Sequence, residues 1–572
     1  MIHYNEIIEF NNSFNYKKKN LSKKKIIKSL FNFNSFQLQS YIEFYLKKKN
    51  ILNSFADSDF DQIYQQINKI QKKDNIDILI VGNDLNLIYK NEKLRVKNFI
   101  EQINVQLSQL INIKKKFSKL EIIFFNLPFI YSDNFQINKN QEEKKKINQF
   151  NLSLANICKE NNIHLFDYNS VILEVGQKNF YSNKNYYVSK SILSEEGCDA
   201  ISSEVSKIIR SIVFVKKKCL VLDLDNTLWG GILGEDGIHG IKISNSYEGE
   251  KYLKFQRYVK HLSNTGIILA IASKNNLSDV KECFNKNKNL ILKWNDFSST
   301  RINWKPKYQN INEIATELNI GKDSIVFFDD SKFERDQMKK FNSKISVISV
   351  PENVDNFISS IENTGFFYSN TELTKEDLKK KLQYNLAKKA NSLKFKFKSN
   401  DTENYLKSLK MKLYISKIQN NNFSRCVQML NKTNQFNFTT TRYTETAFKN
   451  YLKNNKVLSF VLRLKDKFGD HGITGLITIR ILKKECIIDN FLLSCRILGR
   501  NVEEIAITSI MIKLKKMKIN KLVGIYKKTQ KNIQCLDFYK KLNFKEITKE
   551  NFSFDLNKSK ISLKKTMEIK YE

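Results

Sequence analysis

The chain has 572 residues, a length that allows three or four domains of ordinary size. Its 97 basic and 59 acidic residues give a formal net charge of +38, which raises the question of a nucleic-acid partner. Only 11 of the basic residues are arginines, the side chain better suited to reading phosphates and bases, and residues 219–350 hold 19 basic against 16 acidic residues. We therefore expect no specific nucleic-acid ligand, whereas the lysine-rich flanking regions suit an acidic partner protein.

Cysteine usage and apolar runs exclude several classes of protein. The eight cysteines form no Cys-x-x-Cys pair and no Cys/His metal spacing, so the sequence indicates neither a disulfide framework nor a zinc site. The first 13 residues lack the apolar core of a signal peptide, and no apolar run approaches the ~20 residues of a membrane-spanning helix. We therefore expect a cytoplasmic protein with no membrane insertion.

Residues 1–213 alternate between short apolar runs and helical patterns. Residues 77–82, 120–127 and 163–167 are typical of buried strands, and residues 148–161 are typical of a helix. This alternation predicts a doubly wound α/β layer. The first domain is expected to end near Val213, just before a run of three lysines.

The most informative stretch follows at residues 219–240, CLVLDLDNTLWGGILGEDGIHG. Its apolar start predicts a strand buried on both faces, which delivers Asp223, Asp225 and Thr227 onto a turn. Open α/β folds bind their ligands at the carboxyl edge of the sheet. The pattern therefore predicts a functional site at this edge.

Three later segments add polar groups in the same manner. One apolar run ends at Ser273, Lys305 precedes a proline that restrains the backbone, and another apolar run ends in Asp329 and Asp330. Each group alone is equally compatible with a helix cap or a surface ion pair. Together, and in this order, they are what Mg²⁺-assisted phosphoryl transfer requires, because one carboxylate attacks phosphorus while others complete an all-oxygen metal shell.

Residues 219–330 resemble the haloacid dehalogenase (HAD) superfamily of phosphatases. The sequence motif NTLWGG…GEDG is similar to that of one branch of this superfamily, the FkbH-like proteins. Proteins of that branch load glycolytic acyl groups onto acyl carrier proteins for polyketide or surface-polymer synthesis. The resemblance implies a role for each polar group at the strand ends. Asp223 is the nucleophile and Asp225 the general acid/base, Thr227, Ser273 and Lys305 bind phosphate, and Asp223, Asp225, Asp329 and Asp330 hold Mg²⁺.

Three motifs in the last third of the chain resemble the carboxyl-terminal domain of the same branch, which has a GNAT-type acyltransferase fold. They are KTNQFN at 432–437, FGDHG at 468–472 and DNFLLSCRILGR at 489–500. Periodicity predicts a strand and a helix on either side of the turn Arg496-x-x-Gly499-Arg500, whose backbone amides would face an anion. The resemblance implies that these three residues bind the phosphopantetheine arm of a carrier protein, or coenzyme A.

Cys495 lies at the junction of that strand and turn. Neighbouring arginines and a helix N-terminus favour a thiolate. We therefore hypothesise that Cys495 holds the acyl group as a thioester between an acyl phosphate and the carrier. A packed, unreactive thiol is an equally good interpretation. His471 is a further candidate, although its context favours a turn or packing role.

In FkbH-like proteins the amino-terminal region resembles the SGNH-hydrolase fold. Residues 30–36 stand where that fold has its first polar loop, but the chain has neither a Gly-Asp-Ser-Leu nucleophile motif nor an Asp-x-x-His base. A scaffolding or carrier-docking role is therefore favoured over esterase activity. The expected division is an SGNH-like domain at 1–213, a HAD-like domain at 214–365, a helical connector at 366–405 and a GNAT-like domain at 406–572.

These observations predict a three-domain α/β enzyme. Its HAD-like domain is expected to remove phosphate from a 1,3-bisphosphoglycerate-like substrate with Mg²⁺, and its GNAT-like domain to pass the glyceryl group to the thiol of an acyl carrier protein. Only 31 residues separate Ser273 from Lys305, too few for a cap domain, so the site is expected to stay open to a tethered substrate. Two alternatives remain open: a sugar-phosphate phosphatase whose GNAT-like domain acetylates an amine, and a nucleic-acid end phosphatase.

Overall fold

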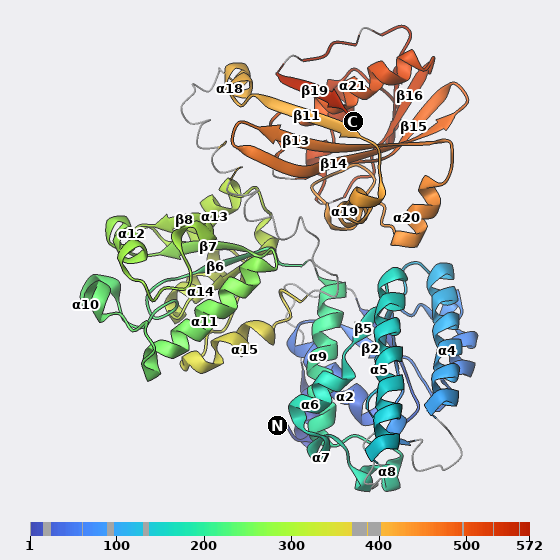
Figure 1. Cartoon of the computed structure of the whole chain (residues 1–572), viewed down its shortest axis with the longest axis vertical. Coiled ribbons are helices and arrows are strands. Elements are labelled where there is room, and N and C mark those ends of the chain that lie inside the picture. The colour runs from blue at the N-terminus through green and yellow to red at the C-terminus, as the bar shows by residue number, and fades with distance from the viewer. Residues whose placement is uncertain are drawn as a thin grey trace. The chain divides into compact units, whose positions relative to one another are not determined.

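The computed structural model describes residues 2–14, 24–59, 61–87, 96–129, 137–214, 216–368, 386, 390, 402–494, 497–529, 531–559, 561–564 and 566–572. They form three α/β domains, each built on its own sheet (Figure 1). Contacts group residues 1–216 with 359–372 as one unit, and residues 217–358 with 373–572 as a second. Among the described residues, no helix has both the length and the apolarity needed to cross a bilayer.

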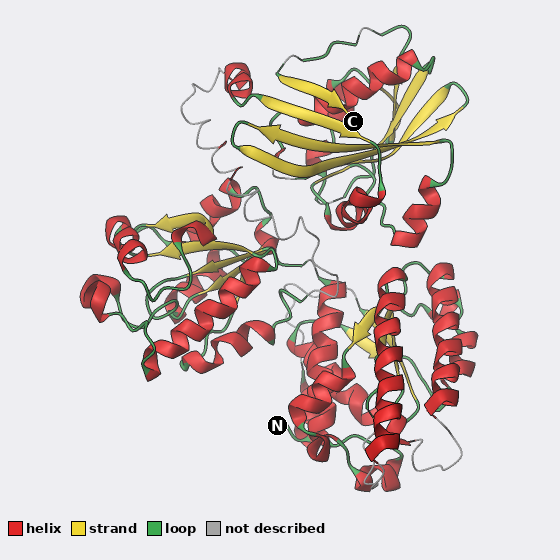
Figure 2. Ribbon diagram, in the orientation of Figure 1, coloured by secondary structure: helices red, strands yellow, loops and turns green. Residues whose placement is uncertain are grey.

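The amino-terminal domain is a parallel five-stranded sheet in the order β2-β1-β3-β4-β5, with an apolar core on each face. Its strands are β1 (Lys25–Phe31), β2 (Asn53–Phe55), β3 (Ile78–Gly82), β4 (Glu121–Phe125) and β5 (His164–Phe166). Its helices are α1 (Tyr4–Ser13), α2 (Phe36–Lys48), α3 (Ile63–Lys69), α4 (Val96–Lys116), α5 (Ile137–Glu160), α6 (Tyr168–Val175), α7 (Gln177–Phe180), α8 (Asn183–Ser189) and α9 (Glu195–Val213). The expected doubly wound layer is confirmed (Figure 2).

The central domain has a second parallel sheet, in the order β10-β9-β6-β7-β8. Its strands are β6 (Cys219–Leu222), β7 (Ile268–Ser273), β8 (Phe297–Ile302), β9 (Ile325–Phe328) and β10 (Ser346–Val347). Its helices are α10 (Leu233–Gly240), α11 (Tyr247–Asn264), α12 (Leu277–Lys286), α13 (Lys307–Glu317), α14 (Lys332–Phe341) and α15 (Phe357–Glu362). Every residue of β6, β7 and β9 is buried, as expected for strands covered by helices on both faces. The two strands that end in aspartates, β6 and β9, are neighbours.

The carboxyl-terminal domain is a largely antiparallel nine-stranded sheet. Its strands are β11 (Met411–Ser416), β12 (Phe436–Asn437), β13 (Val457–Asp466), β14 (Gly469–Leu482), β15 (Glu485–Leu493), β16 (Lys521–Ile525), β17 (Lys545–Thr548), β18 (Asn551–Asp555) and β19 (Met567–Tyr571). Its helices are α18 (Thr402–Ser408), α19 (Asn420–Lys432), α20 (Glu445–Leu452), α21 (Val502–Lys516) and α22 (Phe538–Lys541). The strand and helix expected around residues 486–493 and 502–517 are confirmed as β15 and α21.

The end of the central domain differs from the expected boundary near residue 365. Residues 359–368 belong with the amino-terminal domain, where the guanidinium of Arg210 on α9 lies 4.2 Å from the Phe366 ring and Nη1 donates to the Gly365 carbonyl at 3.5 Å. The segment SSIENTGFFY is too short to show an apolar periodicity from which that packing could be predicted. The helical connector expected at 366–405 lies almost wholly outside the described residues.

Gln256, on α11, fixes the loop that follows β6. Its side chain is fully buried, its Nε2 donates to the Leu228 carbonyl at 2.8 Å, and its Oε1 accepts from the Ile291 and Leu292 amides at 3.0 and 3.1 Å. One side chain therefore satisfies three backbone groups in two segments. This holds the turn that carries the polar residues after β6 against the body of the domain.

We expect Gln256→Leu to lower the free energy of unfolding of the central domain by about 2–5 kcal/mol, because it leaves three backbone groups buried without partners. All three tryptophans of the chain (Trp229, Trp294 and Trp304) lie in this domain, so tryptophan fluorescence during urea titration measures the effect. The control is Lys254→Leu at an exposed position of the same helix, expected to change stability by less than about 0.5 kcal/mol. Equal stabilities of the two variants would contradict the bridging role.

Candidate active site

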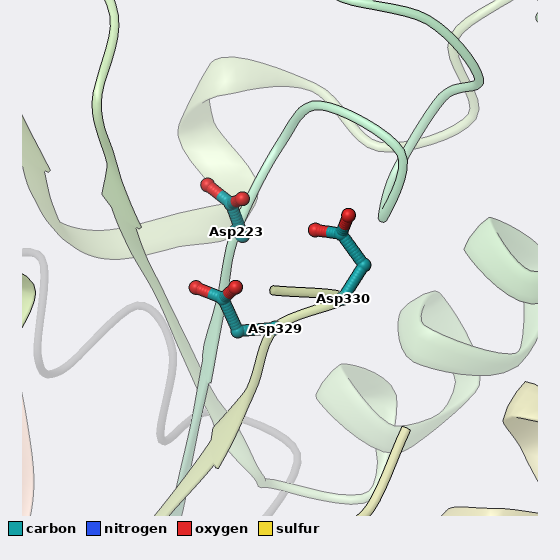
Figure 3. A group of neighbouring side chains, drawn as sticks. All are labelled: Asp223, Asp329 and Asp330. Carbon is teal, nitrogen blue, oxygen red and sulfur yellow. The ribbon is translucent and has the colours of Figure 1, made fainter. Parts of the chain in front are cut away.

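Three carboxylates from two neighbouring strand ends share one space. Asp223 follows β6, and Asp329 and Asp330 follow β9, and one oxygen of each lies within 4.8 Å of the others. Figure 3 shows the three side chains at these strand ends. Asp223 and Asp329 are buried, whereas Asp330 is more exposed. The pairing of Leu222 with Phe328 in the parallel register brings the two strand ends to the same level.

Lys307, the first residue of α13, lies between the two buried aspartates. Its Nζ is 2.9 Å from Asp223 Oδ2 and 2.7 Å from Asp329 Oδ2, and its side chain is only 4% exposed. Burial alone would lower the lysine pKa, but the charges of Asp223 and Asp329 outweigh burial and hold the pKa of Lys307 above its usual value. The ammonium therefore stays charged and offsets part of the repulsion between the carboxylates.

The structure assigns this position to Lys307 and not to Lys305, the lysine expected from the sequence. Lys305 is 63% exposed, and its Nζ lies 3.8 Å from Glu313 at the surface. The difference arises from Pro306, which is the N-cap of α13. The residue before the proline is extended and faces solvent, whereas the first helical residue after it points toward the strand ends.

The Asp225 carboxylate is separate from the three carboxylates that could hold a metal ion. Its Oδ1 accepts from Trp229 Nε1 at 2.9 Å and from the Leu233 amide at 3.0 Å, and its Oδ2 accepts from Asn275 Nδ2 at 2.8 Å. The Asp225 carboxylate is not among the three that lie close enough together to share a cation. Its position two residues after Asp223 suits a proton-transferring group, whereas the expectation that its carboxylate holds the metal is not supported by this geometry.

The two hydroxyl groups expected to bind phosphate lie at the same edge of the sheet. Thr227 is buried and its Oγ1 donates to Asp330 Oδ1 at 3.3 Å. Ser273 is buried at the end of β7, and Asn275 Nδ2 lies 3.4 Å from its Oγ. Asn275 thus links Ser273 to Asp225, a connection that the sequence did not reveal because asparagine two residues beyond a strand is typical of ordinary turns.

The donor set fits a magnesium ion. Three carboxylates supply hard oxygen ligands of the kind Mg²⁺ prefers. Asp223 Oδ1 is buried and has no hydrogen-bond partner among the described residues, although buried carboxylate oxygens are normally paired. Burial and the Asp223 charge raise the pKa of Asp329 to about 7, which shows how unfavourable a third negative charge is here without a cation. We infer that Asp223, Asp329 and Asp330 hold Mg²⁺.

The central domain has no separate cap between its motifs, as expected from their spacing. Between β6 and β7 the chain forms only the short α10 and the sheet-packing α11, and between Ser273 and Lys305 it forms α12 and β8. All these residues belong to the described part of the chain, and none of them builds a separate cap.

The residues expected to bind pantetheine are placed less favourably. Cys495 and Arg496 lie outside the described residues. Gly499 has a positive φ of +78°, and a Cβ there would meet nothing within 4 Å, so the turn itself is open. Arg500 is 3% exposed and its Nη1 donates to Asp466 Oδ2 at 2.9 Å, beside the buried His471. The Arg500 side chain therefore points into the domain and not toward a ligand at the turn, contrary to expectation.

The edge of β15 next to that turn is closed by the chain itself. β14 pairs with one edge along the whole strand, β16 pairs with the other edge only from Glu485 to Ile488, and β12 pairs with that second edge at Leu492 and Leu493. The Phe438 amide extends the pairing by donating to the Phe491 carbonyl at 3.1 Å. A pantetheine arm cannot hydrogen-bond along this part of β15 unless residues 436–438 move.

The corresponding edge of the amino-terminal sheet is filled by mutual hydrogen bonds. Asn32, after β1, exchanges two hydrogen bonds with the backbone of Asp84, after β3, at 3.0 and 2.9 Å. The buried Asp84 carboxylate accepts from the hydroxyls of Tyr168 and Tyr181, both at 2.9 Å. These contacts use the polar groups that follow β1 and β3 to hold the strand ends together.

Comparisons with known proteins agree with this architecture. No protein-family model and no curated protein matches the chain. Among solved structures, the N-terminal part of the protein BF1531 from Bacteroides fragilis, which contains a phosphatase domain and is complexed with Mg, is 25% identical with a TM-score of 0.54. The alignment covers 65% of this chain and 100% of that one.

Acetyltransferases of the GNAT class are also similar to part of the chain. The ribosomal-protein-S18-alanine N-acetyltransferase of Escherichia coli is 12% identical over 27% of this chain and 99% of its own, with a TM-score of 0.21. The PaiA N-acetyltransferase of Thermoplasma acidophilum, in complex with coenzyme A, is 12% identical over 25% and 98%, with a TM-score of 0.19. These two likenesses are too distant to support an argument about activity. Over the 65% of its length that aligns, the chain has the α/β fold of the Bacteroides fragilis protein that contains a phosphatase domain.

We expect magnesium to stabilise the protein more at pH 8 than at pH 5.5. The pKa of Asp329 in the folded protein, about 7, lies above that of an unfolded aspartate, so between the two values the folded protein binds a proton that magnesium must displace. The rise in thermal midpoint on adding Mg²⁺ should therefore shrink as the pH falls through 7. Asp329→Asn serves as the control and should show a weak magnesium effect at both pH values. An equal rise for the wild type at pH 5.5 and pH 8 would contradict the assignment.

Proposed function

We propose that this protein removes phosphate from a phosphorylated three-carbon acid at the central site and transfers the acyl group to the phosphopantetheine thiol of an acyl carrier protein. The observation that carries the phosphatase half is the buried, unpartnered Asp223 Oδ1 opposite two further carboxylates, with Lys307 on its other oxygen. A carboxylate fixed on one side and free on the other is oriented for attack on phosphorus. The motifs that resemble the FkbH-like branch support the acyl-transfer half.

Phosphate removal proceeds in two displacements at Asp223. Its free carboxylate oxygen attacks the phosphorus of the substrate phosphoester, the P–O bond to the sugar-acid oxygen breaks, and that oxygen takes up a proton. Water then attacks the aspartyl-phosphate, releasing inorganic phosphate and restoring the carboxylate. Magnesium, when bound, offsets the negative charge that carboxylates and phosphoryl oxygens bring together. Asp225, held by three donors, is placed to give and take the proton.

Acyl transfer is a separate reaction, and its substrate is the acyl phosphate, a mixed anhydride of a carboxylic acid and phosphoric acid. A thiolate attacks the carbonyl carbon of the acyl phosphate, a C–S bond forms, and the C–O bond to phosphate breaks, so phosphate leaves with the electron pair. In our proposal Cys495 is the first thiol and the carrier thiol the second, by thioester exchange. Direct attack by the carrier thiol gives the same products. From 1,3-bisphosphoglycerate, each loaded carrier then corresponds to two molecules of phosphate, one from each reaction.

Two further observations support a carrier-bound substrate, and a third supports the metal. The central site has no cap among its described residues, so a tethered acyl group can enter. The solved phosphatase structure from Bacteroides fragilis is 25% identical over 65% of this chain and was obtained with Mg, which favours the same metal here. The lysine excess lies in the domains that flank the phosphatase site, where it would attract an acidic carrier.

We expect Asp223→Asn to abolish magnesium-dependent phosphate release from the phosphoester, because an amide is not a nucleophile. Lys307→Met should reduce release by about 100-fold or more, since it removes a charge that stabilises the transferring phosphoryl group. Lys305→Met is the matched control and should stay within about 3-fold of wild type, because this side chain faces solvent. Colorimetric phosphate assays on purified variants measure all three. A severe loss in Lys305→Met with a mild loss in Lys307→Met would overturn the lysine assignment.

Carrier loading separates the two active centres. With 1,3-bisphosphoglycerate and a phosphopantetheinylated carrier, we expect the wild type to form glyceryl carrier, and Asp223→Asn to form carrier that still bears the extra phosphoryl group. Cys495→Ala should lose both the hydroxylamine-labile adduct on the enzyme and carrier loading, yet keep phosphate release from a phosphoester. Cys486→Ala, at a buried position of β15, is the control. Intact-mass spectrometry distinguishes the species, and normal loading by Cys495→Ala would show direct transfer to the carrier.

A further inference from the structure

The carboxyl-terminal domain contains a cavity of about 400 Å³ that none of the predicted site residues lines. It lies between the ends of β15 and β16 on one side and the segment from Thr439 to α20 on the other. Its polar lining includes Thr439, Tyr443, Tyr451, Arg480, Asp489 and Lys527. This volume is near the lower end of the range for small-molecule sites, about 300–1,000 Å³, so the cavity suits a small ligand.

Asp489 enters the cavity because β15 bulges at this residue. Opposite β15, Ile479 pairs with Ile488 and Thr478 pairs with Asn490, which leaves Asp489 as the extra residue. The last residue of β15 that pairs with β16 is Ile488, so the two strands separate at the same point. Bulges re-aim a side chain and often lie beside functional sites. The strand irregularity therefore places a carboxylate at the opening between β15 and β16.

Two neighbours fix the Asp489 carboxylate. The Tyr451 hydroxyl donates to Oδ2 at 2.8 Å, and Arg480 Nη2 lies 3.0 Å from Oδ1. Burial, with the nearby Asp489 charge, raises the pKa of Tyr451 well above its usual value, so its hydroxyl remains a donor. The Asp489 side chain is 13% exposed. Tyr451 and Arg480 therefore hold the Asp489 carboxylate in one orientation, in which it lines the cavity.

The charges of the lining select the kind of ligand. Arg480 already balances Asp489, and the exposed Lys527 adds a second positive charge at the cavity. An amine would meet two cations and a carboxylate that is already paired. A ligand with hydroxyl groups and a negative charge finds hydroxyl donors and acceptors in Thr439, Tyr443 and Tyr451, together with positive charge.

We propose that this cavity binds a short hydroxy acid, or the corresponding hydroxyacyl phosphate before acyl transfer, with Asp489 and Tyr451 on its hydroxyls. The choice of a three-carbon acid rests on the proposed function. The site itself rests on the bulge, the paired carboxylate and the charges of the lining. It gives the carboxyl-terminal domain a means to select the acyl group and disfavours an amine as its substrate.

The test is calorimetric titration of the full-length protein with sodium D-glycerate, with propionate as the matched ligand without hydroxyls and with putrescine as the amine. We expect glycerate to bind at least about 5-fold more tightly than propionate, in line with one lost hydrogen bond, and putrescine not to bind. Tyr451→Phe and Arg480→Gln should each weaken glycerate binding by about 5-fold or more. The controls are Tyr414→Phe and Arg463→Gln, which change the same residue types elsewhere on this sheet and should leave binding unchanged.

Thermal midpoints of all variants establish that each one is folded. Equal affinities for glycerate and propionate, or unchanged glycerate binding in Tyr451→Phe and Arg480→Gln, would overturn the proposal. Preferred binding of putrescine would also overturn it and would favour an amine acetylation site. Phosphate release by the central domain is measured in the same preparations. If the wild type binds no glycerate but releases phosphate and loads the carrier normally, only the proposed cavity site is disproved. If the wild type releases no phosphate, the proposed function is disproved.

Discussion

The salt bridge of Lys307 with Asp223 and Asp329 is the interaction on which the central site depends. Two neighbouring parallel strands end in buried carboxylates, and at that distance like charges would force one of them to bind a proton. A single ammonium between them offsets part of this repulsion, because it attracts each carboxylate at hydrogen-bond distance. The position of Lys307 depends in turn on the start of α13, and therefore on Pro306. One backbone constraint thus sets the charge state of the whole site.

The sequence predicted the sheet and the residues at its carboxyl edge. Runs such as CLVL and IVFF are apolar throughout, which is typical of parallel strands covered on both faces, and the first polar residues after them had to lie at the edge. It did not predict which of Lys305 and Lys307 turns inward, because both flank the same proline and the choice depends on where the helix begins. Gln256 and Asn275 were missed for a related reason. Their partners are backbone groups or side chains far along the chain, and such contacts leave no periodic signal.

In the carboxyl-terminal domain, periodicity correctly predicted the strand before residue 496 and the helix after residue 501, but not where the Arg500 side chain points. Arg500 was expected to bind a ligand, but its side chain pairs with Asp466, 34 residues earlier in the chain. The two residues are close only because β13 pairs with β14. β12 is two residues long, too short for any pattern to reveal, yet it occupies the edge of β15. The inward Arg500 side chain and the pairing of β12 with β15 make the turn a less suitable ligand site than the opening beside Asp489. The β-bulge at Asp489 could not be predicted from the sequence either.

The burial of Lys307 has a consequence for the durability of the enzyme. Acyl phosphates acylate free amines without any catalyst, and the reaction requires the neutral amine because only that form has a lone pair. If an acyl phosphate is the substrate, as proposed above, the 86 lysines of this protein are exposed to damage by that substrate. Lys307 is protected from acylation in two ways. Its side chain is almost inaccessible to solvent, and its two carboxylate neighbours keep its amine protonated. Exposed lysines such as Lys305 lack this protection, so acylation by such a compound would spare the one amine that the site needs.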